Sequence, residues 1–236
     1  MRDRLVVMPA PRLAVPAYFH PHARPADWGW LARSAARVRM VILNVASGPG
    51  PRPDPAFIVA ARRLRRAGVD VAGYVDTGYG RRAPGQALAD LELYLQWYQV
   101  TGVCFDQAAG TADQLGYYAA LARGARTAGV RLVVFNHGVH PVEAYAEHAD
   151  VLGTFEGPWR AYAGLEVPGW TRRWPAGMFQ HVVYSVPPRD FDRALALAIA
   201  RHAGCVYITD RGGANPYDQL PSAAPVPALR RGGETA

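Results

Sequence analysis

The stretch Val103-Cys104-Phe105-Asp106-Gln107 decides the expected fold. It is a short apolar run that ends in a carboxylate and an amide. A helical pattern of apolar residues lies on each side of it, over residues 88–98 and 113–128. A buried strand between two helices, with polar groups at its carboxyl end, is typical of an α/β protein that carries its site at the edge of a parallel sheet.

The same pattern recurs along the chain. Eight short apolar segments bounded by turn-forming residues are expected to be strands: residues 14–19, 40–44, 71–75, 103–105, 131–135, 151–155, 181–184 and 206–208. The helices expected between them cover residues 28–38, with Asp27 as N-cap, and residues 55–67, 84–100, 113–128, 142–148 and 190–203. Regular alternation of this kind predicts a parallel sheet.

The number of strands predicts that this sheet closes into a single (β/α)8 barrel of the TIM type, over residues 1–221, and the chain length fits such a barrel. A doubly wound open sheet is the alternative fold. It lacks its main support, because no glycine-rich dinucleotide fingerprint follows the first strand. The segment 222–236 is rich in Pro, Ala and Gly and is expected to be a disordered tail.

Composition argues against several classes of partner. The net charge is +7, but all 26 basic residues are arginines that are scattered along the chain, so nucleic-acid binding is not expected. Cys104 and Cys205 lie in apolar runs and are expected to be buried, free thiols. There is no metal-ligand motif, so no metal or cofactor is expected.

Membrane association is not expected either. The apolar run at residues 5–10 is too short for a signal-peptide core, and no later segment is long enough to span a bilayer. A cytoplasmic protein is therefore expected. The sequence leaves the oligomeric state open.

The expected strands all end in polar side chains. In a (β/α)8 barrel these ends form one rim, and that rim carries the active site. The rim residues are Tyr18, Asn44, Asp76, Asp106, Asn136, Glu156, Tyr184 or Ser185, and Asp210. Because side chains alternate along a strand, Asp106 and Cys104 should point into the barrel, whereas Val103 and Phe105 should face the helices.

Carboxylates that converge from different strands suit glycosidic bond cleavage. One carboxyl group protonates the leaving oxygen, and the other activates water or stabilises positive charge at the anomeric carbon. If Asp106 and Glu156 share such a site, they should lie roughly 5–10 Å apart. Tyr79 and Trp159 follow strands and are expected to form pocket walls that contact a sugar.

Several motifs resemble those of the spherulin-4-like proteins, also called spherulation-specific family 4. Residues 44–50 resemble the family's NPxSGPG segment, residues 73–80 its GYVxTxYG strand end, and residues 94–98 its YxxWY helix. Phe105-Asp106-Gln107 occupies the position of the family's FDE. Residues 154–156 resemble a later acidic strand end, and residues 209–221 resemble the closing segment.

The resemblance implies a (β/α)8 barrel related to microbial exopolysaccharide hydrolases, similar to fungal enzymes that cut α-1,4-linked N-acetylgalactosamine in galactosaminogalactan. It implies that Asp106 and Glu156 are catalytic, with an oligosaccharide or small molecule as substrate. The family's middle acid falls on Gln107, which cannot exchange a proton at neutral pH but can hold a sugar hydroxyl. Val45 and His137 also depart from the family pattern.

Three functions remain open from the sequence. The first is a glycoside hydrolase with a reduced set of acids, in which Asp106 is the nucleophile or electrostatic stabiliser and Glu156 is the general acid/base. The second is a cytoplasmic barrel that carries out proton transfers on a small metabolite with Asp106, Glu156 and His137. The third is a carbohydrate-binding protein without turnover. Gln107 favours the second and third, whereas the retained acids and aromatic loops favour the first.

Overall fold

A computed structural model describes residues 10–222 of the chain. Residues 1–9 and 223–236 lie outside the described part. The disordered tail expected at residues 222–236 falls there except for Ser222, as does nearly all of the N-terminal apolar run, so both stay predictions.

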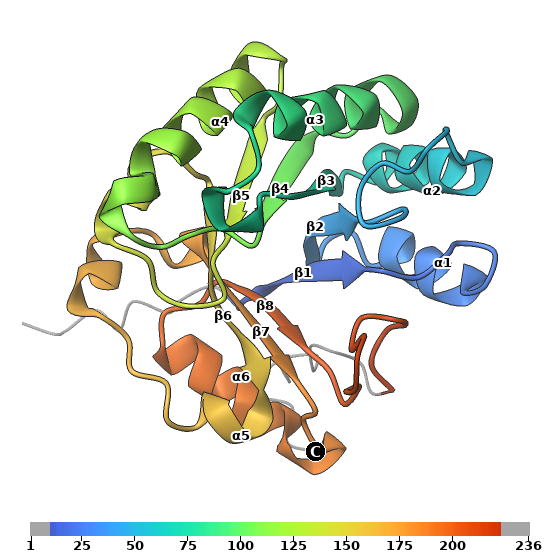
Figure 1. Cartoon of the computed structure of the whole chain (residues 1–236). Coiled ribbons are helices and arrows are strands. Elements are labelled where there is room, and N and C mark those ends of the chain that lie inside the picture. Colours follow the sequence, from blue (N-terminus) through green and yellow to red (C-terminus); the bar gives the residue numbers. More distant parts are fainter. Residues whose placement is uncertain (1–9, 223–236) are drawn as a thin grey trace, which may run out of the picture.

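Eight parallel strands form a closed barrel in the order of the sequence (Figure 1). They are β1 (Arg12–Ala17), β2 (Val38–Leu43), β3 (Asp70–Asp76), β4 (Gly102–Asp106), β5 (Leu132–Asn136), β6 (Val151–Pro158), β7 (Phe179–Tyr184) and β8 (Cys205–Ile208). The barrel closes where Arg12 and Leu13 of β1 pair with Cys205 and Val206 of β8. The predicted (β/α)8 barrel is therefore confirmed, and the open doubly wound sheet is excluded.

Helices pack around the outside of the strands (Figure 1). They are α1 (Pro25–Arg33), α2 (Pro55–Arg66), α3 (Pro84–Tyr98), α4 (Leu115–Thr127), α5 (Trp159–Tyr162) and α6 (Phe191–Ala200). No helix formed by residues 10–222 combines the length and the apolar character needed to cross a bilayer.

Two helix predictions need correction. The helix expected at residues 28–38 is α1, which starts at Pro25 and ends at Arg33. Proline is favoured at the first helical position because it has no N–H to satisfy and a fixed φ, so Asp27 lies within the first turn and is not the N-cap. The helix expected at residues 142–148 is the 3-10 helix η3 (Glu143–Glu147). Its buried Tyr145 donates a hydrogen bond to the carbonyl of Thr111, so tertiary contacts fix this short connection.

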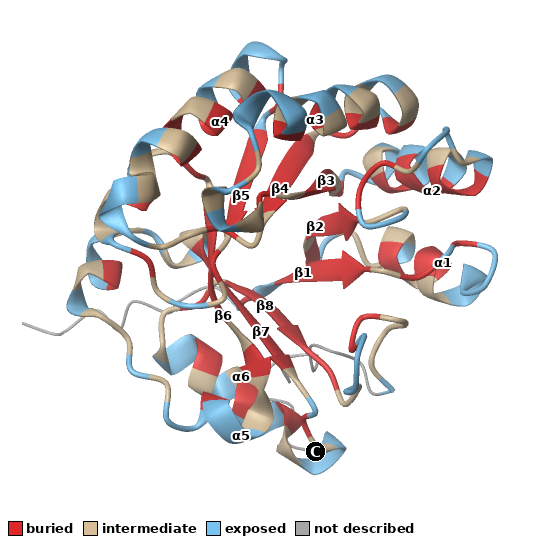
Figure 2. Ribbon diagram, in the orientation of Figure 1, coloured by how far each residue is buried: buried red, intermediate tan, exposed pale blue. Residues whose placement is uncertain are grey.

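The strands are largely buried (Figure 2), and alternation of side chains along them separates two hydrophobic cores. Cys104 and Tyr74 belong to the core inside the barrel, whereas Val103 and Phe105 belong to the larger core between strands and helices. The predicted orientation of β4 is thus confirmed. Cys104 and Cys205 are buried and free, as predicted.

The loop after β2 is held by helix α3. The Tyr98 hydroxyl donates a hydrogen bond to the carbonyl of Pro49 and accepts one from the backbone N–H of Asp54. The Asn44 side chain accepts a hydrogen bond from the N–H of Gly48. The motif at residues 44–50 therefore contacts the motif at residues 94–98, and this contact fixes the loop after β2.

Gly73 tests the packing of β3 against α3. A Cβ atom at this position would lie 2.5 Å from Cγ of the buried Tyr94, a ring that cannot move away. We expect Gly73→Ala to lower the free energy of unfolding by about 1–3 kcal/mol, because overpacking strains the core. The matched control is Gly85→Ala in α3, where an added Cβ meets no atom within 4 Å. Chemical denaturation would measure both; equal stability of the two variants would contradict the packing argument.

Candidate active site

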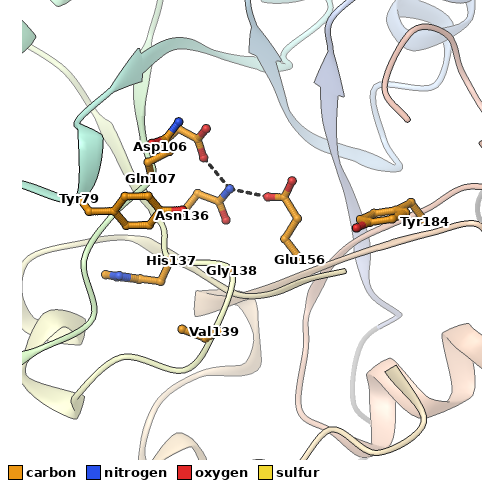
Figure 3. A pocket seen from close by; sticks show the side chains of 9 residues that line it. All are labelled: Tyr79, Asp106, Gln107, Asn136, His137, Gly138, Val139, Glu156 and Tyr184. Atoms are coloured by element: carbon orange, nitrogen blue, oxygen red, sulfur yellow. Dashed lines mark hydrogen bonds between the residues drawn. The ribbon is translucent and has the colours of Figure 1, made fainter. Parts of the chain in front are cut away.

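Strands β4, β5 and β6 bring three side chains together at the carboxyl end of the barrel (Figure 3). The Asn136 amide nitrogen donates one hydrogen bond to Oδ1 of Asp106, at 2.7 Å, and another to Oε2 of Glu156, at 2.6 Å. A single side-chain amide therefore bridges the two predicted catalytic carboxylates.

The shared donor limits the distance between the carboxylates. Both accepting oxygens lie within 2.7 Å of one nitrogen, so they are less than twice that distance apart. The carboxyl groups of retaining glycosidases are about 5–5.5 Å apart, and those of inverting ones about 6.5–9.5 Å. The bound concerns the two nearest oxygens, and it places Asp106 and Glu156 close enough to act on one glycosidic bond.

Two tyrosines that the sequence analysis did not select complete the site. The hydroxyl of Tyr217 donates a hydrogen bond to Oε1 of Glu156 at 2.6 Å. Tyr74 lies near Asp106 and lowers the pKa of its carboxyl group. Tyr18, which was selected, stands between them, with edge-to-face contacts to the rings of both. Tyr217 lies in the closing motif and Tyr74 alternates with Asp76 along β3, so both had a sequence signal.

Burial sets the electrostatics of the carboxylates. It raises the pKa of Asp106 above the ordinary value, although hydrogen bonds from Asn136 and Tyr74 act in the opposite direction. Burial also raises the pKa of Glu156, against hydrogen bonds from Tyr217 and Asn136, and the nearby charge of Asp106 adds to the rise. A raised carboxyl pKa keeps a proton available nearer neutral pH, as general acid catalysis requires.

A cavity of about 370 Å³ opens above these side chains. Asp106, Gln107, Asn136 and Glu156 line it, together with Tyr79, His137, Gly138, Val139 and Tyr184. Figure 3 shows Tyr184 on one side of the carboxylates and Tyr79 on the other. Tyr79 is 51% exposed and Val139 is 62% exposed. The pocket thus has a polar floor and an apolar rim open to solvent, which suits a ligand with hydroxyl groups and flat apolar faces.

Gln107 is placed by its backbone as well as by its position after β4. It adopts a left-handed conformation with φ of 49°. Its carbonyl accepts hydrogen bonds from the N–H of Tyr79 and the hydroxyl of Thr77. This turn links the ends of β3 and β4 and leaves the Gln107 side chain at the pocket beside Asp106.

The His137 ring points away from the carboxylates (Figure 3). It packs against Tyr145, with ring centroids 4.8 Å apart, and its Nδ1 lies 3.1 Å from the carbonyl of Ala108. A carbonyl only accepts, so Nδ1 carries the proton. Burial lowers the pKa of His137 to about 4, so the ring is neutral at neutral pH. His137 therefore borders the pocket, but its ring is directed away from the two carboxylates.

Three of the predicted rim residues and one predicted pocket-wall residue have local contacts and do not line the pocket. Asn44 caps its own loop, and Asp76 accepts a hydrogen bond from the N–H of Gly78. Trp159 packs against Tyr162, and Asp210 accepts hydrogen bonds from the N–H and hydroxyl of Ser222. Within residues 10–222, no group of three or more His, Cys, Asp or Glu side chains could hold a metal ion.

Comparison with known proteins identifies the class. The model of the spherulation-specific family 4 matches residues 12–225, and the chain belongs to this family. It is 32% identical to Spherulin-4 of Physarum polycephalum over 148 residues, a match that spans 61% of this chain and 44% of that protein. The crystal structure of Aspergillus clavatus Sph3 in complex with GalNAc is similar, with a TM-score of 0.77 and 25% identity, over 91% of this chain and 94% of that one.

The barrel architecture extends to more distant proteins. The α-galactosidase I of Mortierella vinacea matches 89% of this chain and 69% of its own, with a TM-score of 0.58 and 9% identity. The spore cortex-lytic enzyme SleL of Bacillus cereus matches 88% of this chain and 73% of its own, with a TM-score of 0.54 and 8% identity. At these identities the likeness concerns the fold alone.

The raised pKa of Asp106 predicts a pH-dependent stability. A carboxyl group with a folded-state pKa above its unfolded value stabilises the fold fully below the unfolded pKa, and this contribution is lost as pH rises through the folded pKa. Asp106→Asn removes that loss and keeps an oxygen for Asn136. The free energy of unfolding of the variant, minus that of the wild type, should therefore be larger at about pH 8 than at about pH 4. Chemical denaturation at both pH values measures this difference. A difference that is the same at both pH values would contradict this.

The Tyr217 hydroxyl predicts a second effect. Tyr217→Phe removes a donor from a buried carboxylate, and hydrogen bonds to charged groups contribute about 1.5–3 kcal/mol. We expect that loss in the free energy of unfolding near neutral pH, with a further rise of the Glu156 pKa visible in an NMR titration. Tyr145→Phe, which removes a hydrogen bond to a neutral carbonyl, is the control and should leave the Glu156 titration unchanged. An unaltered titration in Tyr217→Phe would argue against the contact.

Proposed function

We propose that this protein is a glycoside hydrolase that acts on an amino-sugar-containing glycan or glycoside through Asp106 and Glu156. The observation that carries the proposal is the pair of buried carboxylates that share the Asn136 amide at the floor of an open pocket. Membership of the spherulation-specific family 4 and the likeness to Sph3, whose crystal structure contains GalNAc, support an amino sugar as ligand.

The two carboxylates differ in a way that suits different roles. Burial raises the pKa of both groups, but Glu156 also faces the negative charge of Asp106, which favours its protonated form, so Glu156 is the better candidate for the general acid/base. Asp106 ends strand β4, where Asn136 and Tyr74 favour its ionised form. It would act as nucleophile or stabilise positive charge at the anomeric carbon.

Gln107 supports a second candidate function, a carbohydrate-binding protein without turnover. An amide holds a sugar hydroxyl as well as a carboxylate does but transfers no proton. Losing an acid–base group typically costs on the order of 10²–10⁴ in rate. A small-metabolite reaction that used His137 has less support, because the ring packs away from the carboxylates and is neutral.

Restoring the acid at position 107 tests the proposal. We expect the wild type to hydrolyse oligomers of α-1,4-linked galactosamine or N-acetylgalactosamine slowly, and Gln107→Glu to raise the rate by about 10²-fold or more because an acid–base group is regained. Asp106→Asn and Glu156→Gln should abolish hydrolysis. Product detection by mass spectrometry measures all four proteins side by side.

Each outcome separates the candidates. Turnover that survives in both Asp106→Asn and Glu156→Gln would refute the assigned site. Binding of oligomers without turnover, even in Gln107→Glu, would favour the binding protein. Wild-type hydrolysis equal to or above that of Gln107→Glu would show that Gln107 does not limit the chemistry. Circular dichroism of each variant serves as the folding control.

A further inference from the structure

We propose that a second site, at the amino end of the barrel, binds a phosphoryl group, either as inorganic phosphate or as the end of a phosphomonoester. The cavity that forms it, called here the arginine pocket, has a volume of about 370 Å³ and is lined by Arg62, Arg65, Arg66 and Gln99. The proposal does not depend on hydrolase activity, because none of these residues lines the pocket above the two carboxylates.

Topology separates the arginine pocket from the carboxylates. Helix α2 follows the carboxyl end of β2, and its last turn directly precedes β3. The arginines in that turn therefore lie beside the amino ends of the strands. Gln99 is the C-cap of α3, which leads into β4 at the same end of the barrel. Asp106 and Glu156 lie at the opposite end, so a ligand of the arginine pocket is not the sugar of the candidate active site.

The helical period brings the three arginines together. Arg62, Arg65 and Arg66 are three and four positions apart, which places their side chains on one face of α2. Arg65 donates a hydrogen bond from its guanidinium to the side-chain oxygen of Gln99, at 2.9 Å, and so joins α2 to α3. The amide nitrogen of Gln99 has two further N–H donors. The lining thus offers many hydrogen-bond donors and no carboxylate.

The positive charge of the arginine pocket is not balanced by the protein. Other arginines at this end of the barrel have acidic partners: Arg39 pairs with Asp70 at 2.9 Å, and Arg126 pairs with Asp150 at 2.6 Å. Within residues 10–222, the three arginines of the pocket form no ion pair with a carboxylate. A counter-charge for them must therefore come from outside the described part of the chain.

The three guanidinium groups also repel one another. Burial lowers the pKa of Arg65, and the positive charges of Arg62 and Arg66 lower it further. All three stay charged at neutral pH, because an arginine side chain is effectively never deprotonated in a protein. Like charges at this spacing destabilise a helix, and a bound anion would turn the repulsion into attraction.

The helix dipole explains part of this arrangement but not all of it. Cations in the last turn of a helix are favoured by its negative end, and Arg63, Arg65 and Arg66 occupy that turn of α2. The dipole does not require that arginines share one face, and it does not involve Gln99. Arg63 has the same favourable position along the helix but does not line the arginine pocket, so it separates the two explanations.

The donor set suits a phosphoryl group in particular. The planar guanidinium presents two parallel N–H groups that match two phosphate oxygens, and several arginines around one group can balance a double negative charge. Arg62 and Arg66 are exposed, so the site is open to a ligand from solvent. The cavity volume lies in the usual range for small-molecule sites, about 300–1,000 Å³, which leaves room for the ester group of a phosphomonoester.

Isothermal titration calorimetry on the full chain, in a chloride buffer at about pH 7.5, tests the proposal with inorganic phosphate, glycerol 1-phosphate and nitrate. We expect saturable binding of one phosphate per chain, and binding of nitrate at least about tenfold weaker, because nitrate carries a single charge. Tighter binding of glycerol 1-phosphate than of inorganic phosphate would identify a phosphomonoester as the ligand, and the reverse order would identify the free ion.

Variants assign the binding to the arginine pocket. Arg62→Gln and Arg65→Gln should each weaken phosphate binding about tenfold or more, because each loses a charge-assisted contact. The matched control Arg63→Gln removes the same charge from the same turn of α2 outside the pocket and should keep the affinity within about twofold. Arg62 is exposed, so its variant keeps the test valid if Arg65→Gln lowers stability, which thermal unfolding followed by circular dichroism measures.

Three results would overturn the proposal. The first is no saturable binding of inorganic phosphate or glycerol 1-phosphate. The second is equal weakening by Arg63→Gln, which would show general attraction of anions to a basic helix. The third is arginine-dependent binding of a single-stranded oligonucleotide or of vesicles of anionic lipid without binding of either small phosphate, which would make this face a docking surface for a polyanion instead.

Discussion

The rim of this barrel is arranged around one side-chain amide. Asn136 donates to Asp106 and to Glu156, and without it two buried carboxylates would face each other with fewer donors between them. Burying a charge is costly unless hydrogen bonds satisfy it. The surrounding tyrosines serve the same need, since Tyr217 donates to Glu156 and Tyr74 favours the ionised form of Asp106. The site therefore depends on donors as much as on acids.

Strand geometry makes the shared contact possible. Asn136 pairs with Gly153 of β6, and a Cβ atom at Gly153 would collide with the Asn136 side-chain oxygen. The register of β6 against β7 then shifts between Gly153 and Phe155. A bulge re-aims side chains, and here it accompanies the inward direction of Glu156 while Phe155 packs in the outer core. Gly153 and the irregular register of β6 thus help to position Asn136 and Glu156.

The chemistry of the pocket follows from what is present at its floor. Two carboxylates with raised pKa and a short separation suit acid–base and nucleophilic roles at an anomeric carbon. The neutral Gln107 cannot transfer a proton, so the proposed chemistry depends on Asp106 and Glu156 alone.

The sequence by itself determined the barrel, because it contains eight short apolar strand segments with helical patterns between them. It also determined the two carboxylates and Gln107, since they directly follow or end apolar runs. Only the tertiary structure decided that Asn136 joins the acids, that Tyr217 reaches Glu156 from 61 positions along the chain, and that His137 turns outward. Strand ends can be read locally, whereas the partner of a rim side chain depends on register, bulges and chain closure, which bring distant residues into contact.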